Sequence, residues 1–534
     1  MALVFALAVP LTVTAAPSPD APPTVARDVA PLVYRHCTPC HHAGGSAPFP
    51  LVTYADAKGR ARQLVTTVVR REMPPWKPEP GFGSFVGERR LSDDQVDTFR
   101  RWLAAGAPAG PAVDAPEQPT FNEGWTLGPP DLVVRMPVPY RLQPGGSDRL
   151  RQFVLPVPTT TVQYVKAWQF RTSAGAAVHH ATLMLDSTRA TRRFDDADPE
   201  PGYEGLVPRS AHNPDGYFLG WTPGQTPYVA PDRLTWRLDA GDDLIAMLHL
   251  MPGDREQTVD VSVGLYFASR PPDEQPIMIR LNRQDLDIPA GQADYRAVDR
   301  YTLPVDVDVY GVQPHAHNLA REVQAFATLP DNTRVWLVRI SDWDFHWQDA
   351  YRLASPVALP AGTVLTMEIR YDNSATNRRN PFRPPRRVTY GQHTSEEMGD
   401  VWLQVVPRRV EDRPRLAASL EAKLLPQNIS GYEVMLRRDP DNVSLHDDVA
   451  LLYVQAGDLA RAAAHFGESV RFQPASRAAH YNLGNVLLGL GRLGEADARF
   501  REALRLSPDY ELAREGLEKV RTALSLPVDR ARGK

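Results

Sequence analysis

The pattern of hydrophobic and polar residues changes several times along the chain, and each pattern predicts a different kind of structure. Between residues 25 and 103, apolar residues recur at helical spacing. The last such stretch, 92–103, begins with Ser92 as a helix N-cap and has Gln95 three residues later. Residues 104–122 are rich in Ala, Pro and Gly and have no apolar period. We therefore predict a compact helical module over 25–103, followed by a linker.

Short runs of alternating or β-branched residues, which are typical of strands, fill the chain from about 125 to 407. One example is the run 132–134, and clusters of Gly, Pro, Asn and Asp separate such runs. The pattern predicts an antiparallel all-β region that is too long for one ordinary β-sandwich. A Pro-rich break at 270–276 divides it. We expect two β-sandwich domains, 125–272 and 277–407.

A repeat appears in the last part of the chain, over 426–525. Its period is 34 residues, as the positions of three prolines show: Pro440, Pro474 and Pro508. This region resembles a tetratricopeptide array, and a final helix over 510–524 would cap it. The resemblance implies a concave surface for a protein partner. The alternative is that these helices only pack on the chain's own β region.

Composition and the N-terminal sequence indicate which partners and which cellular location to expect. The chain has 534 residues, 51 Pro and 35 Gly, and a net charge of only −4, so nothing indicates a nucleic-acid or anionic-membrane partner. Residues 1–16 are apolar, too short to cross a bilayer, and end in small residues, which predicts a signal peptide and a periplasmic or extracellular location. No Lys or Arg precedes Arg27, so an apolar N-terminus of a cytosolic protein is the alternative. No later run predicts a transmembrane segment.

The two cysteines, Cys37 and Cys40, are followed directly by His41. This spacing is the attachment signature of haem c, with two thiols for the vinyl groups and an imidazole for the iron. A redox pair or half of a zinc site would also contain CxxC, but the chain has no second cysteine pair. Met73 lies on a proline-rich loop and is our candidate for the sixth iron ligand, unless it fills the core instead. The motif, this loop and the closing helix resemble a small cytochrome c domain.

Five histidines of the β region have the spacing of metal ligands. His315 and His317 are two residues apart, so a strand would present both imidazoles on one side. His179 and His180 are adjacent and would point apart on a regular strand, so a shared ion requires a bulge or a strand end. His249 is a lone imidazole in an apolar strand. Each of these, taken singly, could instead be a core histidine.

Met398 completes the set, although by itself it would be interpreted as core filling. With both cysteines assigned to haem, the β region offers one group of three imidazoles and one group of two imidazoles and a thioether. Both groups suit copper, and the soft sulfur favours Cu(I). Zinc would fit the three imidazoles but would gain little from a methionine.

In this order, the histidines and Met398 resemble the type II copper, ascorbate-dependent monooxygenases, a family that includes peptidylglycine α-hydroxylating and dopamine β-monooxygenase. The resemblance covers residues 125–407. It implies that an electron-transfer copper is held by His179, His180 and His249. It also implies that an oxygen-binding, catalytic copper is held by His315, His317 and Met398. O2, a small-molecule substrate and ascorbate would then be the reactants.

Two departures from the family argue for a different substrate. Gln313 stands where the peptide-hydroxylating member has an Arg that grips the substrate carboxylate, and Trp402 stands where it has a Tyr. No cysteine is left for the disulfides of animal members. We expect a monooxygenase with two copper ions and one haem c, supplied with electrons by ascorbate, by its own haem, or by both. The alternative is a non-catalytic electron-transfer or copper-handling protein that docks a partner through its repeats.

Overall fold

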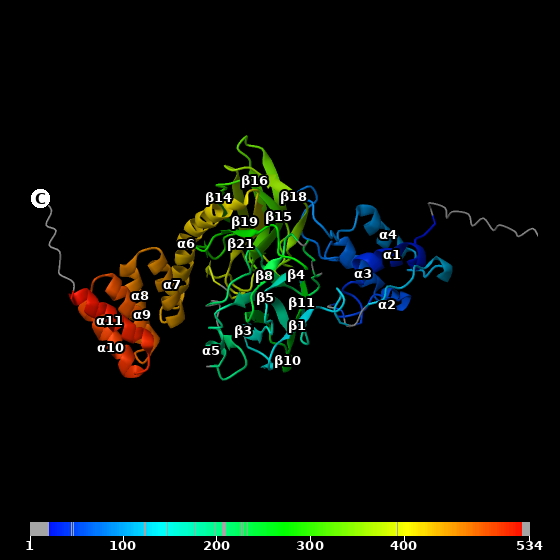
Figure 1. The fold of residues 1–534 in the computed structure, drawn as a ribbon. Coiled ribbons are helices and arrows are strands. Elements are labelled where there is room, and N and C mark those ends of the chain that lie inside the picture. The colour runs from blue at the N-terminus through cyan, green and yellow to red at the C-terminus, as the bar shows by residue number, and fades with distance from the viewer. Residues whose placement is uncertain are drawn as a thin grey trace, which may run out of the picture. The chain divides into compact units, whose positions relative to one another are not determined.

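The computed structural model describes residues 21–525, apart from residues 44, 46, 122, 123, 147, 176, 197, 205–209, 226, 228, 232 and 392. The signal peptide predicted over residues 1–16 lies outside the described residues. Two compact units make up the chain, and each is described by itself (Figure 1). One comprises Met1–Trp76 and Gly87–Thr126, and the other comprises Lys77–Val86 and Leu127–Lys534.

The first unit is helical in its described part. Its helices are η1 (Val25–Val29), α1 (Ala30–His36), α2 (Tyr54–Gly59), α3 (Ala61–Val69), α4 (Asp93–Ala104) and η2 (Ala112–Asp114). The predicted closing helix is confirmed as α4, and Ser92 and Gln95 form the expected capping box. Phe99 and Trp102 of α4 are fully buried and form the centre of the unit's core.

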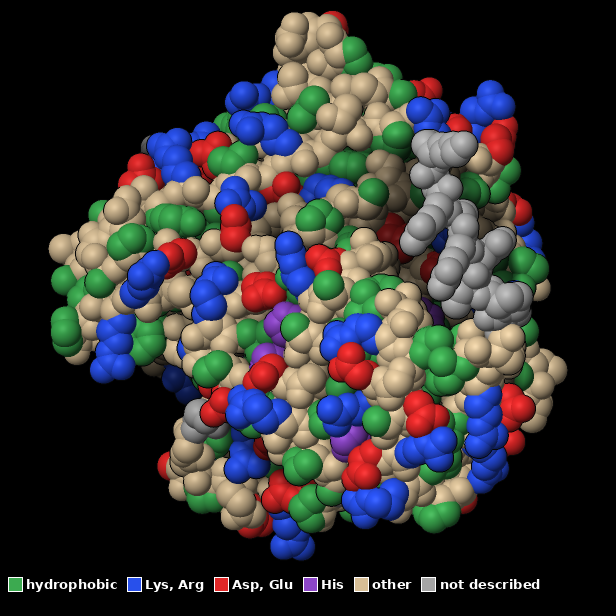
Figure 2. All heavy atoms as spheres, turned by 90° about the vertical axis from the view of Figure 1, so that its left-hand side faces the viewer, with side chains coloured by type: hydrophobic (Ala, Val, Ile, Leu, Met, Phe, Trp, Pro, Cys, Tyr) green, Lys and Arg blue, Asp and Glu red, His purple; other side chains and the backbone are tan. Residues whose placement is uncertain are grey.

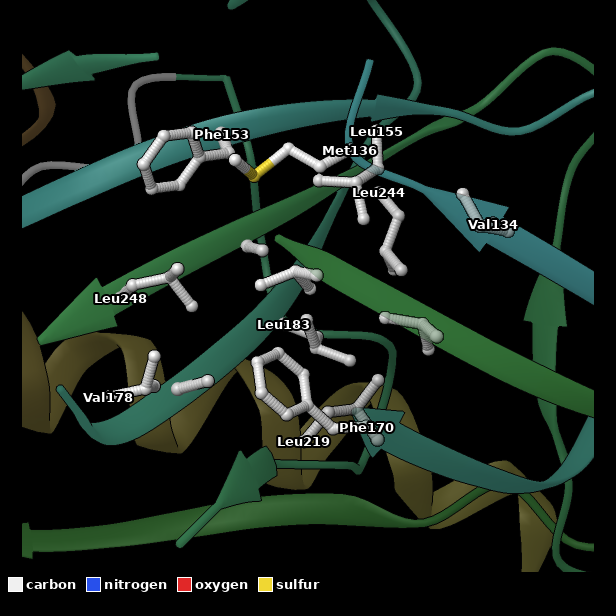
Figure 3. Close-up of a cluster of buried hydrophobic side chains, with 14 of the residues drawn as sticks. Val134, Met136, Phe153, Leu155, Phe170, Val178, Leu183, Leu219, Leu244 and Leu248 are labelled. Atoms are coloured by element: carbon white, nitrogen blue, oxygen red, sulfur yellow. The ribbon is translucent and has the colours of Figure 1, made fainter. Parts of the chain in front are cut away.

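The β-rich region begins with a four-stranded sheet in the order β1-β11-β4-β8 and a five-stranded sheet in the order β6-β3-β9-β5-β7. The strands are β1 (Leu132–Arg135), β2 (Tyr140–Leu142), β3 (Arg149–Pro156), β4 (Gln163–Thr172), β5 (Val178–Asp186), β6 (Tyr203–Glu204), β7 (Leu219–Trp221), β8 (Trp236–Leu238), β9 (Asp243–Leu250), β10 (Gln257–Val259) and β11 (Val261–Phe267). A short helix, α5 (Arg192–Asp195), follows β5. Side chains of both sheets share one buried core, which includes Val134 and Phe170 from one sheet and Phe153 and Leu183 from the other (Figure 3).

The second half of the β-rich region has two four-stranded sheets, β12-β21-β15-β18 and β14-β19-β16-β17. The strands are β12 (Ile277–Asn282), β13 (Asp287–Ile288), β14 (Tyr295–Thr302), β15 (Val307–Ala316), β16 (Ala320–Thr328), β17 (Arg334–Ile340), β18 (Tyr351–Leu359), β19 (Val364–Tyr371), β20 (Val388–Thr389) and β21 (Gly399–Pro407). The pairings within these sheets are antiparallel, as the alternating pattern predicts.

The segment Lys77–Val86 packs with the β-rich region, although it lies inside the range 25–103 predicted as one helical module. Phe85 forms an antiparallel bridge with Leu353, and Val86 N donates to the carbonyl of Arg352 at 2.9 Å. The helical pattern fails here because the segment's backbone groups bond to a distant strand instead of to one another.

Helices occupy the C-terminal part of the chain. They are η3 (Val410–Asp412), α6 (Arg413–Arg438), α7 (Val443–Gln455), α8 (Leu459–Phe472), α9 (Arg477–Gly489), α10 (Leu493–Leu506) and α11 (Glu511–Ser525). Helix α6 starts before residue 426, where the array was predicted to begin, and it contains Pro426. A proline weakens a helix locally, but α6 is also held from outside, since Lys423 forms an ion pair with Asp299 of β14 at 2.6 Å.

Within the part of the chain that the structure describes, no helix is both long and apolar enough to cross a membrane. On the face drawn in Figure 2, side chains of both charge signs are interspersed. This agrees with the small net charge of −4.

Candidate metal centre

The three imidazoles predicted to share one ion do lie together. His180 of β5 is paired directly with His249 of β9, and the register between these strands shifts between Val178 and His180. The shift is a β-bulge at His179, and a bulge re-aims side chains that would otherwise alternate. Ring nitrogens of all three histidines therefore lie within 4.8 Å of one another. The bulge that the adjacent histidines require is confirmed.

The nitrogen atoms of this group suit a metal ion. Nδ1 of His179 and Nδ1 of His180 are 3.1 Å apart, close to the roughly 3.3 Å expected for two imidazoles on one tetrahedral ion. His249 donates from Nε2 to the carboxylate of Asp148 at 2.7 Å, which directs its Nδ1 away from that carboxylate. Nδ1 of His249, the nitrogen that faces away from Asp148, is buried and has no hydrogen-bond partner within the described residues. An unsatisfied buried nitrogen beside two further imidazoles fits a ligand set.

Burial keeps the imidazoles of His179 and His180 neutral. It lowers the pKa of His179 to about 3, with a further contribution from the neighbouring His249. Burial also places the pKa of His180 well below its usual value. Neutral imidazoles carry the lone pairs that a metal ion needs, so no proton has to be displaced from these two rings at neutral pH.

The second histidine pair lies where β15 ends. His315 is in β15, His317 follows its last residue, and their ring centroids are 5.3 Å apart. Nδ1 of His315 contacts Oε1 of Gln348, and Nδ1 of His317 lies 3.0 Å from the carbonyl oxygen of Glu396. Each Nδ1–H can therefore donate to an oxygen, which leaves both Nε2 atoms available as ligands. Burial lowers the pKa of both rings, that of His317 to about 3.

Met398 directly precedes β21, the strand that pairs with β15. Ala316 is paired with Gly399, so the backbone of Met398 lies beside that of His317. The hydroxyl of Tyr371 donates to the carbonyl of Met398 at 2.7 Å. The strand register thus brings the third predicted ligand next to the histidine pair.

A buried carboxylate that sequence reasoning missed joins these two segments. Glu397 accepts hydrogen bonds from the backbone N–H groups of His317, at 2.9 Å, and of Leu319. Burial raises the pKa of Glu397 to about 8 in spite of these donors. Its place next to Met398 in the sequence was the signal that could have drawn attention to it.

One phenyl ring contacts both histidine groups. Phe345, in the loop between β17 and β18, stacks on His179 with ring centroids 4.5 Å apart and planes at 17°. It also meets His317 edge-on at 5.7 Å. The two histidine groups, one from each half of the β-rich region, therefore flank a single aromatic side chain. In the same loop, Trp343 donates from Nε1 to the carbonyl of His317 at 3.2 Å.

The predicted haem ligands lie in the helical unit. Cys37 is the C-cap residue of α1 and is buried, Cys40 is half-buried, and neither forms a disulfide. Nδ1 of His41 lies 2.9 Å from the carbonyl oxygen of Phe49, so Nε2 is the nitrogen left for an iron. Met73 follows α3 and is 43% exposed, so it is not filling the core.

Comparisons with known proteins bear on the C-terminal helices. Residues 477–510 match the family model for the tetratricopeptide repeat. No curated protein matches the chain. Among solved structures, the first repeat domain of Spaghetti (RPAP3) bound to an HSP90 peptide is 23% identical, covers 21% of this chain and 87% of its own, and has a TM-score of 0.19.

Two further structures give the same local likeness. The repeat domain of Arabidopsis OM64 is 20% identical over 20% of this chain and 88% of its own, with a TM-score of 0.18. MamA is 21% identical over 21% of this chain and 58% of its own, with a TM-score of 0.19. By the family model, residues 477–510, which form α9 and α10, are a tetratricopeptide repeat.

Proposed function

We propose that the chain is a copper-dependent monooxygenase that hydroxylates an activated C–H bond of a small molecule. The observation that carries the proposal is the bulge at His179, which brings two adjacent imidazoles together with His249, whose buried Nδ1 has no partner within the described residues. Three imidazoles suit copper or zinc, and a second histidine pair whose backbone lies beside that of Met398 favours copper. Two different ligand sets near one another would hold two copper ions. Each ion could supply one of the two electrons that the hydroxylation requires.

In the proposed reaction, O2 and a substrate C–H bond consume two electrons and two protons and yield a C–OH group and water. Two bound coppers would supply the electrons, one each, and an external donor of the ascorbate class would restore them. His179, His180 and His249 would hold the electron-transfer copper. His315, His317 and Met398 would hold the copper that meets oxygen.

The surrounding residues have roles in binding and orientation. Asp148 fixes the tautomer of His249 through the 2.7 Å hydrogen bond to Nε2, and Gln348 does the same for His315. Glu397 holds the backbone that follows His317. Phe345 would hold the two groups in place relative to each other, because its ring packs against imidazoles of both. The substrate would approach on the remaining side.

We propose that the helical unit is a cytochrome c-like module. Cys37 and Cys40 would attach the haem, His41 would bind the iron through Nε2, and the exposed Met73 would be the second axial ligand. The haem would be a second one-electron donor to the coppers, beside ascorbate. An exported, periplasmic or extracellular location accompanies this proposal, as do two β-sandwich domains that carry the coppers.

A second candidate function is a non-catalytic electron-transfer or copper-handling protein. The match of residues 477–510 to a tetratricopeptide repeat favours it, because such repeats commonly bind other proteins. A docked protein partner is compatible with either function.

The first experiment is metal and haem analysis of protein expressed in the periplasm, followed by oxygen uptake with ascorbate and a panel of small apolar or amphipathic molecules. The proposal predicts two coppers per chain and uptake that depends on one member of the panel. One copper or none, with no uptake, would favour the second candidate.

A further inference from the structure

The segment Lys77–Val86 lies along the edge of the sheet that carries His315. Strand β18 is the edge of the order β12-β21-β15-β18. Along this edge, Phe85 bridges Leu353, and Ala354 N donates to the carbonyl of Ser84 at 2.8 Å. The added backbone occupies an edge that would otherwise be open.

The other end of this segment holds the loop between β17 and β18. Lys77 forms ion pairs with Asp342 at 3.3 Å and Asp344 at 3.5 Å, and its side chain is only 13% exposed. Glu79 N donates to the carbonyl of Arg339 at 2.8 Å, where β17 ends. The segment is thus bonded to the start of the loop and to the strand that follows it.

The same loop contacts the imidazoles of both proposed copper sites. Phe345 follows Asp344 directly and packs on His179 and His317. Gln348 contacts Nδ1 of His315. A single loop therefore contacts Lys77 at its start and the imidazoles further along.

The segment Lys77–Val86 is joined directly in the sequence to the helical unit. Lys77 directly follows Trp76, the last residue of the first part of the helical unit, and Met73 is four residues before it. The residue proposed as an axial haem ligand is therefore joined by a short stretch of chain to the segment that holds this loop.

We propose that the loop Ser341–Ala350, held by Lys77, is the path by which an electron passes from the haem to the copper of His179, His180 and His249. This inference rests on the proposed function. In each transfer a bound haem would give one electron to a bound copper, so that the haem iron goes from ferrous to ferric as the copper goes from cupric to cuprous. No bond is formed or broken, and an external donor of the ascorbate class reduces the haem again.

Cross-linking tests the contact without any metal. A zero-length carbodiimide reagent joins a lysine amine to a carboxylate that it touches, so the full chain should give a peptide that links Lys77 to Asp342 or Asp344. If mass spectrometry finds no such link, while Lys423 is found joined to its partner Asp299, the proposed contact is wrong.

Stopped-flow mixing tests the path in the loaded protein. Reduced protein with haem and copper is mixed with oxygen, and oxidation of the haem is followed by its absorbance. Lys77→Ala and Asp344→Asn should slow this oxidation at least tenfold, and Lys77→Arg should restore it. The matched control is Lys423→Ala, which removes a lysine of similar burial that pairs with Asp299 on β14 and should leave the rate unchanged.

The outcomes separate this inference from the proposed function. Oxygen uptake with excess ascorbate should persist in Lys77→Ala, because ascorbate also reduces the coppers directly. Haem oxidation that is as fast in Lys77→Ala as in the parent would overturn the path and leave the copper sites intact. Haem oxidation that is equally fast without copper would overturn the relay altogether.

Discussion

The phenyl ring of Phe345 lies nearly parallel to the imidazole of His179, with ring centroids 4.5 Å apart. The two residues come from different halves of the β-rich region, so this contact joins two groups of sheets as well as two rings. Because His179 is the bulged residue of β5, its ring orientation depends on what packs against it.

Phe345→Ala should weaken copper binding to the group formed by His179, His180 and His249. The change removes the stacked ring and leaves a cavity, so we expect a loss of unfolding free energy of about 3–5 kcal/mol and a roughly tenfold loss of copper affinity. Competition with a copper chelator measures the affinity. Phe326→Ala is the control, since Phe326 is also buried but faces Trp336 instead of a histidine. If both variants lose affinity equally, the stacking has no specific role.

Asp148→Asn should also weaken copper binding to the group formed by His179, His180 and His249, for a different reason. The carboxylate accepts a hydrogen bond from Nε2 of His249 at 2.7 Å and one from the hydroxyl of Thr394 at 3.2 Å. Loss of the charge lowers the basicity of the ring, and such substitutions cost about 10–100-fold in metal affinity. A chelator titration should show one of two coppers released early. Unchanged release of both coppers would argue that His249 is not a ligand.

Asp186 should contribute stability to the folded protein at neutral pH that is lost in acid. Burial alone would raise the pKa of this carboxyl, but hydrogen bonds from Thr191 and Thr188 outweigh it and lower the pKa to about 2 from 3.8. A lowered pKa adds stability above 3.8 that is lost as the pH falls toward 2. Asp186→Asn should therefore reduce the free energy of unfolding at pH 7, and the difference from the parent should shrink in acid. A difference that stays constant with pH would contradict this account.

Phe500→Ala should unfold the C-terminal helices and spare the metal groups. Phe500 is fully buried in α10, and glycines at 484 and 516 lie directly against its ring. We expect a loss of about 3–5 kcal/mol in the stability of the repeat. Circular dichroism should show an early helical transition, whereas copper content should equal that of the parent. Loss of copper as well would mean that the helices and sheets unfold as one body.

Local rules of backbone geometry predicted much of the site. Adjacent residues on a strand point apart, so His179 and His180 could share an ion only with a bulge, and the bulge is present. The capping box at Ser92 and the 34-residue period are equally local signals. Each of these signals can be recognised from the sequence spacing of the residues concerned.

Contacts between distant segments could not be predicted in this way. Nothing near Asp148 or Phe345 in the sequence indicates which histidine each will meet, because strand pairing brings them together across many residues. The segment Lys77–Val86 was predicted as part of the helical module, because no local pattern shows that its partner is β18. The array was predicted to begin at residue 426, whereas α6 begins at Arg413, because no local pattern shows the ion pair with β14 that supports this helix.

The most direct test of the central claim is the copper content of three proteins: the parent, His180→Ala and His315→Ala. If the two histidine groups are separate copper sites, the parent should bind two coppers per chain and each variant should bind one. The haem spectrum should be the same in all three, since neither histidine belongs to the helical unit. A parent that binds no copper, or variants that bind as much as the parent, would contradict the account.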